Sequence, residues 1–92
     1  MTVPQARRRE ISVDGRVFRL TPSESRLAEL LVLNSGRTVP WPHIIEYVWP
    51  DPDRQPLGVK GCVSALVGRL RRKGVPIRRL YGQGLAIGPE LA

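Results

Sequence analysis

The stretch VKGCVSALVGRLRRK, residues 59–73, is the part of the chain that decides the fold. Its apolar residues recur at the spacing of one helix face, and Gly74 follows its last cation as a stop signal. This pattern predicts a helix that runs from Leu57 or Gly58 to Arg72 and buries one stripe of side chains. The stripe consists of Val59, Val63, Leu66, Val67 and Leu70.

The residues after this helix predict a β-hairpin. The run PIRRLY, residues 76–81, and the run LAI, residues 85–87, are separated by Gly82-Gln83-Gly84, which is a turn signal. The helix ends in four cations, and the first strand of the hairpin carries Arg78 and Arg79. A basic helix followed by a basic hairpin is typical of small domains that bind duplex nucleic acid.

Upstream, the sequence predicts another hairpin and a capped helix. Residues 10–20 alternate apolar and polar side chains around Asp14-Gly15, which is a strong local signal for a hairpin. Thr21 then suits the cap of a helix, Pro22 suits its first position, and Glu24 completes a capping box. The helix is expected to end at Asn34-Ser35-Gly36 and to bury Leu27, Leu30 and Leu31, with Leu33 as a further candidate.

A short helix and a stiff loop fill the remaining part of the chain. Residues 43–48 predict the helix, whose apolar side consists of Ile44, Ile45, Val48 and Trp49. Residues 50–56 contain three prolines and are expected to form a loop. The resulting order predicts an α+β fold of the winged helix-turn-helix type, with a short N-terminal β-hairpin, three helices and a C-terminal β-hairpin as the wing. We expect this domain to span residues 10–88, after a flexible basic arm at residues 1–9 and before a tail at residues 89–92.

The distribution of charge indicates a polyanionic partner. The net charge is +7, and the segment from Arg54 to Pro89 holds eight cations and no carboxylate. Seven of the eight acidic residues lie at or before Asp53, so the excess charge comes from the second half of the chain. Such an excess favours nucleic acid or an acidic membrane surface. Because no segment is a basic amphipathic helix with an exposed apolar face, nucleic acid is the better match.

Other classes of function lack the residues that they need. Cys62 is the single cysteine and His43 the single histidine, so neither a disulfide framework nor a zinc site is expected. No Ser/His/Asp or Cys/His set suggests catalysis, and we expect no enzyme activity and no cofactor. No stretch reads as a signal peptide or as a membrane span. We therefore expect a cytoplasmic protein associated with the nucleoid.

Five short motifs occur in the order and spacing of one known family. They are Thr21 with Glu24, Gly36-Arg37-Thr38-Val39, Val48-Trp49, Arg69-Leu70-Arg71-Arg72-Lys73, and Gly82-Gln83-Gly84. Over residues 10–88 the chain resembles the winged-helix DNA-binding domain of OmpR/PhoB-type response regulators. The resemblance implies a bacterial DNA-binding transcriptional regulator, with its third helix in the major groove and its wing near the minor groove. In that family a receiver domain usually precedes this one and the N-terminal sheet usually has four strands; here we expect no receiver, and room for two strands.

The resemblance places the DNA contacts on the third helix, on the wing and at the start of the second helix. Ser64 lies on the expected base-facing side, Arg71 matches a phosphate-binding position, and Arg79 or Gln83 is expected to take the minor-groove position. A solvated helix end, which the helix dipole favours for cations, is the alternative for the basic cluster at residues 69–73. The complete predicted set is Trp41, His43, Lys60, Ser64, Arg69, Arg71, Arg72, Lys73, Arg78, Arg79, Tyr81 and Gln83.

A second kind of partner is predicted from the loop and from the small residues of the third helix. The loop matches a segment that some family members use to contact RNA polymerase, and its candidate contact residues are Asp51, Asp53 and Arg54. Gly61 and Gly68 stand where the family commonly has long polar side chains. The alternative function is therefore a protein-interaction module that binds RNA polymerase, a sigma factor or itself, with little sequence-specific DNA readout. A homodimer on double-stranded DNA is a further expectation.

Overall fold

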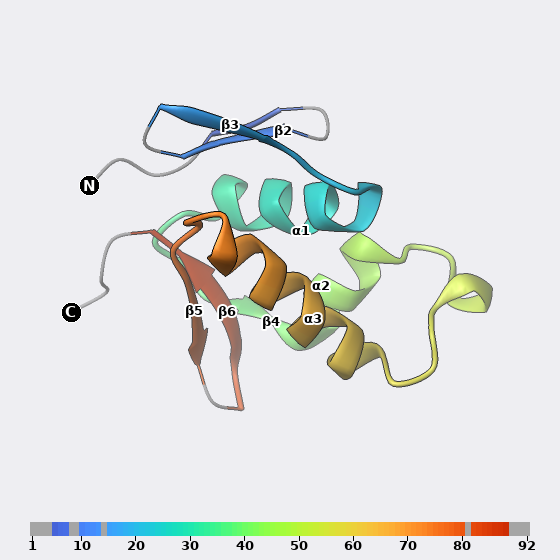
Figure 1. Ribbon diagram of the computed structural model, residues 1–92. Helices are drawn as coiled ribbons and strands as arrows, with labels where there is room; N and C mark the ends of the chain where they lie inside the picture. The colour runs from blue at the N-terminus through green and yellow to red at the C-terminus, as the bar shows by residue number, and fades with distance from the viewer. Residues whose placement is uncertain (1–4, 8–9, 14, 81, 89–92) are drawn as a thin grey trace.

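Two small antiparallel sheets and three α-helices make up the described part of the chain in this computed structural model (Figure 1). The structure describes residues 5–7, 10–13, 15–80 and 82–88. The strand orders are β1-β2-β3 and β4-β6-β5, which confirms the predicted α+β winged-helix fold. In chain order the elements are β1 (Gln5–Arg7), β2 (Glu10–Val13), β3 (Arg16–Arg19), α1 (Pro22–Leu33), β4 (Val39–Pro40), α2 (Trp41–Val48), a 3-10 helix (Pro52–Arg54), α3 (Val59–Arg72), β5 (Ile77–Leu80) and β6 (Gly84–Ile87).

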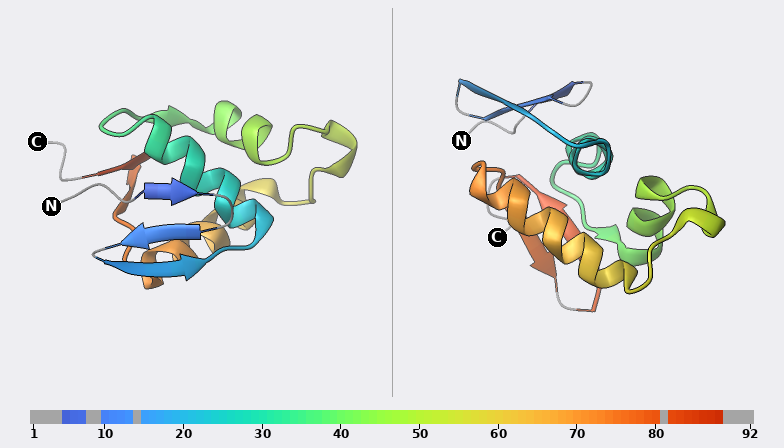
Figure 2. Two further views of the ribbon diagram at one scale, coloured as in Figure 1. Left: turned by 90° about the horizontal axis from the view of Figure 1, so that it is seen from above. Right: turned by 45° about the vertical axis from the view of Figure 1, so that its right-hand side comes forward.

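The first helix, α1, lies between the two halves of the molecule. In Figure 1 the N-terminal sheet lies above α1, whereas α3 and the wing strands β5 and β6 lie below it. The right-hand view of Figure 2 shows the same arrangement with α1 seen nearly end-on. A hydrophobic core fills the space between these elements. Burial of a Leu, Ile or Val side chain contributes about 1.5–3 kcal/mol to the stability of the fold, so this core fixes α3 against the other elements. Its fully buried side chains include Leu27, Leu31, Val63, Leu70, Leu85 and Ile87.

The N-terminal sheet contains the predicted hairpin and one strand more. Ile11 of β2 is opposite Phe18 of β3, and the chain turns at Gly15, whose φ of 81° suits glycine. Ile11 is fully buried, so the predicted inward face is confirmed. The additional strand is β1, which pairs with β2 although the sequence predicted an arm there. Its three residues, QAR, have no apolar alternation, and the backbone ladder that holds an edge strand leaves no signature in side-chain pattern.

The start of α1 has the predicted capping box. The Glu24 N–H donates to the Thr21 Oγ1 over 3.3 Å, and the Thr21 N–H donates to the Glu24 Oε1 over 2.9 Å. Leu27, Leu30 and Leu31 are buried as expected, but Leu33 is 70% exposed. Leu33 lies two residues after Leu31, which is about 200° around the helix, and it therefore points away from the core.

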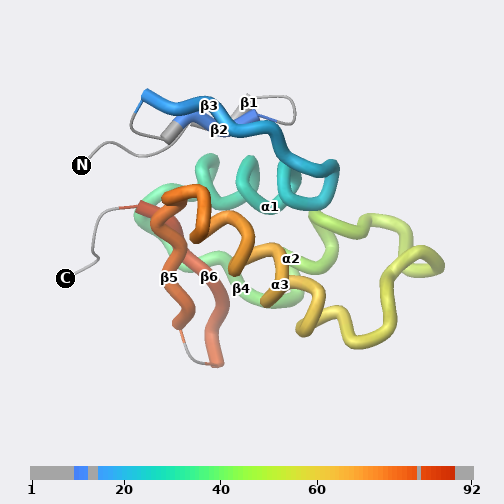
Figure 3. The backbone as a smooth tube through the Cα atoms, in the orientation of Figure 1, coloured from blue at the N-terminus to red at the C-terminus, as the bar shows by residue number. Residues whose placement is uncertain are grey.

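The second helix begins earlier than predicted, at Trp41 instead of His43. Its second residue, Pro42, is tolerated because the N–H groups of a first turn have no partner within the helix. Ile44 and Val48 are buried, as expected. The proline-rich segment after α2 is a loop with a single 3-10 turn, capped by the Asp51 side chain, and Figure 3 shows it extending to one side of the molecule.

The third helix buries four residues of the predicted stripe, Val63, Leu66, Val67 and Leu70, whereas Val59 at its start is half-buried. The wing lies beside this helix. Val63 and Leu70 are fully buried, and the helix starts at Val59, after Gly58 in a left-handed conformation with φ 66°. In the wing sheet, Gly84 of β6 is opposite Pro40 of β4. A Cβ at Gly84 would lie 1.8 Å from the Val39 carbonyl oxygen, so only glycine permits these two strands to approach so closely.

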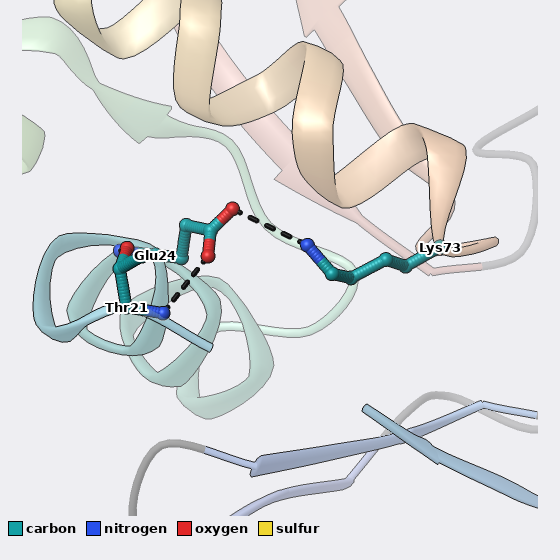
Figure 4. A network of polar contacts seen from close by, with 3 residues as sticks. All are labelled: Thr21, Glu24 and Lys73. Atoms are coloured by element: carbon teal, nitrogen blue, oxygen red, sulfur yellow. Dashed lines mark hydrogen bonds and ion pairs between the residues drawn. The ribbon is translucent and has the colours of Figure 1, made fainter. Parts of the chain in front are cut away.

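A polar network joins the beginning of α1 to the end of α3 (Figure 4). The Lys73 Nζ lies 3.4 Å from the Glu24 Oε2, and the side chain of Glu24 is only 3% exposed. Burial alone would raise the pKa of Glu24, but the hydrogen bonds from Thr21 and the charge of Lys73 outweigh it and lower the pKa below its ordinary value of 4.5. The folded state therefore favours an ionised Glu24.

We expect the folded state to lose stability in acid as Glu24 becomes protonated. Folding lowers the pKa of Glu24, so the stabilising contribution of its carboxylate is fully present above pH 4.5. That contribution is lost as the pH falls through the folded-state pKa. Glu24→Gln removes the charge; it should lower the free energy of unfolding near neutral pH by about 1–3 kcal/mol. Urea unfolding across the acid range should also show a weaker pH dependence than in the wild type. The exposed Glu10→Gln is the matched control, and an equally steep acid loss in Glu24→Gln would contradict the assignment.

Candidate nucleic-acid interface

The outward face of α3 has cations towards its two ends and small residues between them. Lys60 near the start of the helix is exposed, as are Arg69 and Arg72 near its end. Between them lie Gly61 and Ala65, which are exposed, and Ser64 and Gly68, which are half-buried. A Cβ at either helical glycine would meet no atom within 4 Å, so packing in the described residues does not require glycine there. This face is therefore basic at its ends and flat in its middle.

Arg71 is tied to the fold by its guanidinium. Its Nε and Nη2 donate to the Ile77 carbonyl oxygen over 3.0 and 2.8 Å. Both bonds go to one acceptor at the start of β5, so Arg71 fixes the end of α3 to the wing. A guanidinium has five N–H donors, which leaves three for another acceptor. The predicted phosphate contact stays a prediction, and the structure adds a role in holding the fold.

Lys73 is directed towards the interior of the fold and not along the outward face of α3. Figure 4 shows its side chain reaching from the end of α3 to Glu24 on α1. The side chain is 26% exposed, and its ammonium group pairs with a buried carboxylate. Sequence spacing grouped Lys73 with Arg69 and Arg72, whereas the structure gives it an intramolecular partner.

The wing, α3 and α2 meet at a side-chain cluster formed by Trp41, Ser64 and Arg79. The Arg79 Nη2 donates to the Ser64 Oγ over 2.7 Å. The Arg79 Cζ also lies 6.0 Å from the centroid of the Trp41 ring, at the outer limit of a cation–π contact. A groove of about 330 Å³ opens at this cluster, and Lys60, Leu80 and Gly82 complete its lining. The sequence analysis proposed Trp41, Ser64 and Arg79 as separate DNA contacts and did not predict that their side chains lie together.

The other predicted DNA contacts lie around this cluster. Arg78 is half-buried on β5, Gln83 is exposed in the wing turn, and His43 is exposed on α2. Leu85 of β6 is fully buried in the core. Tyr81 lies outside the described residues, and its predicted role stays a prediction.

The loop between α2 and α3 presents charged and apolar side chains to solvent. Arg54 and Asp51 form an ion pair at 3.7 Å, and their side chains are 86% and 53% exposed. Such an exposed pair contributes at most about 1 kcal/mol, so the two charges remain accessible to a partner. Leu57, just before α3, is fully exposed. Its apolar side chain next to a charged loop was not singled out from the sequence, where it read as a possible first residue of the helix.

The described residues were compared with the requirements of a metal site and of a membrane-spanning helix. They contain no group of three or more His, Cys, Asp or Glu side chains placed to hold a metal ion. None of the helices in the described ranges has the length and apolar character needed to cross a membrane.

Comparison with protein families gives a match over most of the domain. The family described as "Transcriptional regulatory protein, C terminal" matches residues 15–84. The transcriptional regulatory protein PhoP of Escherichia coli K12 is 33% identical over 66 residues, which cover 72% of this chain and 28% of PhoP. The virulence transcriptional regulatory protein PhoP of Salmonella typhimurium is 35% identical over 66 residues, with the same coverage. The chain thus spans about a quarter of the length of these curated relatives.

Two solved structures share this fold. The DNA-binding domain of E. coli CadC superposes with a TM-score of 0.69 at 20% identity, covering 89% of this chain and 80% of that one. The C-terminal domain of the nisin resistance regulator NsrR, a lantibiotic response regulator, gives a TM-score of 0.72 at 16% identity, with 95% and 92% covered. At these identities the likeness establishes the fold alone.

The role of Arg71 in the fold can be measured by its removal. We expect Arg71→Ala to lower the free energy of unfolding by about 1–2 kcal/mol, because both hydrogen bonds to the Ile77 carbonyl are lost. Arg72→Ala removes the same charge from an exposed neighbouring position and should change stability by less than about 0.5 kcal/mol. Urea unfolding compares the stability of the two variants. Equal losses of stability would show that the hydrogen bonds from Arg71 to Ile77 do not stabilise the fold.

Proposed function

The chain belongs to the OmpR/PhoB-type family of DNA-binding C-terminal domains of transcriptional regulatory proteins, and on that premise we propose that it regulates transcription by binding double-stranded DNA. The observation that carries the proposal is the absence of carboxylates from Arg54 to Pro89, a segment that includes all of α3, β5 and β6. Its exposed cations lie on one helix and on the hairpin beside it, where phosphates on both sides of a groove are within reach. In this role it would act in the cytoplasm, on the nucleoid.

We assign α3 to the major groove and the wing to the neighbouring minor groove. The width of the major groove admits an α-helix, and the small residues in the middle of α3 permit close approach of its backbone to the base edges. The cations at the two ends of the helix would then lie over the phosphate backbones. Trp41 and His43, in the first turn of α2, are proposed to contact phosphate as well.

The proposal predicts DNA binding that weakens steeply with salt. Each phosphate contact contributes about 0.9 to the slope of log affinity against log salt concentration, because counterions are released. Arg72→Ala should therefore reduce that slope by about 1 and lower affinity for all sequences alike, whereas the overall fold is kept. Fluorescence anisotropy with labelled duplexes over a range of salt concentrations measures both quantities.

The control for this prediction is Arg16→Ala, which removes an equal charge from the exposed surface of β3 in the other sheet. Its salt slope should match that of the wild type. Wild-type protein without salt-sensitive affinity for any duplex would exclude DNA binding as the function. Stoichiometric titration in the same assay reports whether two copies occupy one site.

The loop between α2 and α3 is proposed as the contact with RNA polymerase or its sigma factor. The loop extends away from α3 and the wing (Figure 3), so its side chains stay accessible when those elements hold DNA. Asp51, Asp53 and Arg54 offer charge of both signs, and the exposed Leu57 offers an apolar anchor. Anchors of this kind, ringed by polar residues, are common at protein interfaces.

Two substitutions test the loop without disturbing the DNA contacts. Asp53→Ala and Leu57→Ser should each reduce capture of bacterial RNA polymerase holoenzyme, and neither should change affinity for DNA. Neither side chain is buried, so the fold should be kept. Asp51 is unsuitable because its side chain caps the 3-10 turn. Undiminished capture by both variants would exclude the loop as the contact.

The flat middle of α3 favours one second candidate, a protein-interaction module with little base readout. Gly61 and Gly68 each cost a helix about 1 kcal/mol relative to alanine, and neither is required by packing in the described residues. The DNA titration and the polymerase capture together separate the two functions. Capture of polymerase without salt-sensitive DNA binding would favour the second.

A further inference from the structure

Two side chains that were predicted to contact different grooves of DNA form a hydrogen bond with each other. Ser64 lies on the outward side of α3, and Arg79 lies on the first strand of the wing, yet the Arg79 Nη2 is 2.7 Å from the Ser64 Oγ. A guanidinium held against α3 is not free to reach the minor groove at the same time. The cluster therefore assigns Arg79 a partner within the fold.

Arg79 is held in place from two directions. Its backbone is in the paired part of the wing, opposite Leu85 of β6, so the position of its Cα is fixed by the ladder. Its guanidinium carbon lies over the Trp41 ring, 6.0 Å from the centroid. The bond to Ser64 is thus supported by strand pairing and by an aromatic neighbour, and it lies beside the groove of about 330 Å³.

The chemistry of the pair decides what Ser64 can still do. A guanidinium only donates hydrogen bonds, whereas a hydroxyl has one proton and two lone pairs. The Ser64 oxygen is therefore the acceptor in this bond, and its proton is left to donate. Its second lone pair lies beside the guanidinium, whose positive charge makes it a poorer acceptor for a further N–H group. Among the described residues, Arg79 is the sole hydrogen-bond partner of the Ser64 side chain. A bond from a charged donor also polarises the hydroxyl and strengthens its own donation.

We propose that Arg79 is a positioning residue that makes Ser64 a hydrogen-bond donor, and that Ser64 selects a base edge with an acceptor in the major groove. This inference rests on the proposed function. The acceptor edges are N7 and O6 of guanine, N7 of adenine and O4 of thymine, whereas cytosine presents the N4 amino donor. Ser64 consequently discriminates against cytosine at the position that it faces, although a serine alone would tolerate either kind of edge.

The experiment measures base preference at each position for matched variants. Selection from a random duplex library gives the preferred sequence of the wild type, and anisotropy titrations then compare it with every single-base-pair variant. At one base pair the wild type should bind an acceptor edge about fivefold more tightly than a cytosine edge, the worth of one hydrogen bond. Ser64→Ala should lose this preference.

The decisive variant is Arg79→Met, which keeps an unbranched apolar side chain near Trp41 and removes the donor. It should lose the same preference at the same base pair although Ser64 is intact, because without the nearby positive charge the lone pairs of the Ser64 oxygen accept readily from cytosine N4. The double variant should be no less selective than either single variant. Arg16→Met, an equal loss of charge on β3, should keep the full preference.

Each of the other possible results of this experiment overturns one part of the proposal. If Arg79→Met keeps the preference that Ser64→Ala loses, Arg79 does not position Ser64. If Ser64→Ala keeps it, Ser64 does not read the base. Salt-sensitive binding by the wild type together with either result overturns this inference and leaves the proposed function standing. Wild-type protein that binds no duplex overturns both.

Discussion

The Glu24 carboxylate is the constraint on which the arrangement of the helices depends. One of its oxygens accepts from the Thr21 backbone at the start of α1, and the other pairs with Lys73 at the end of α3, 49 residues away in sequence. A buried carboxylate that lost either partner would be costly, because it would keep its charge with fewer compensating contacts. The pair therefore favours one orientation of α3 against α1, and that orientation determines which face of α3 is left to a partner.

The cations at the end of α3 differ in their surroundings: some have partners within the fold, and others are exposed on the surface of the helix. Arg71 and Lys73 have partners within the fold, the Ile77 carbonyl and Glu24 respectively, although Arg71 is itself exposed. Lys60, Arg69 and Arg72 are exposed on α3. A cluster that is continuous in sequence is thus divided between stability and an outward surface. The surface that remains is basic at its ends, which suits phosphates, and nearly without polar side chains in its middle.

The parts of the fold that depend on local sequence were predicted well, and the parts that depend on distant contacts were not. Spacings of three and four residues predicted the capping box at Thr21 and Glu24 and the buried stripe of α3. The capping box and the central part of the stripe were confirmed. The strand β1 and the bond between Arg79 and Ser64 arise from pairing between elements, which leaves no mark in local pattern. The site residues were for this reason identified by type and position, whereas their contacts with one another required the structure.

The close contact at Gly84 has a consequence for how the wing meets any partner. Its backbone touches β4 at the end of β6 nearest the turn, so the wing is attached to β4 close to that turn. This attachment restrains movement of β6 relative to β4. In the proposed function the domain would then bind DNA with little change in its own shape, and the deformability of the DNA would become part of what is recognised.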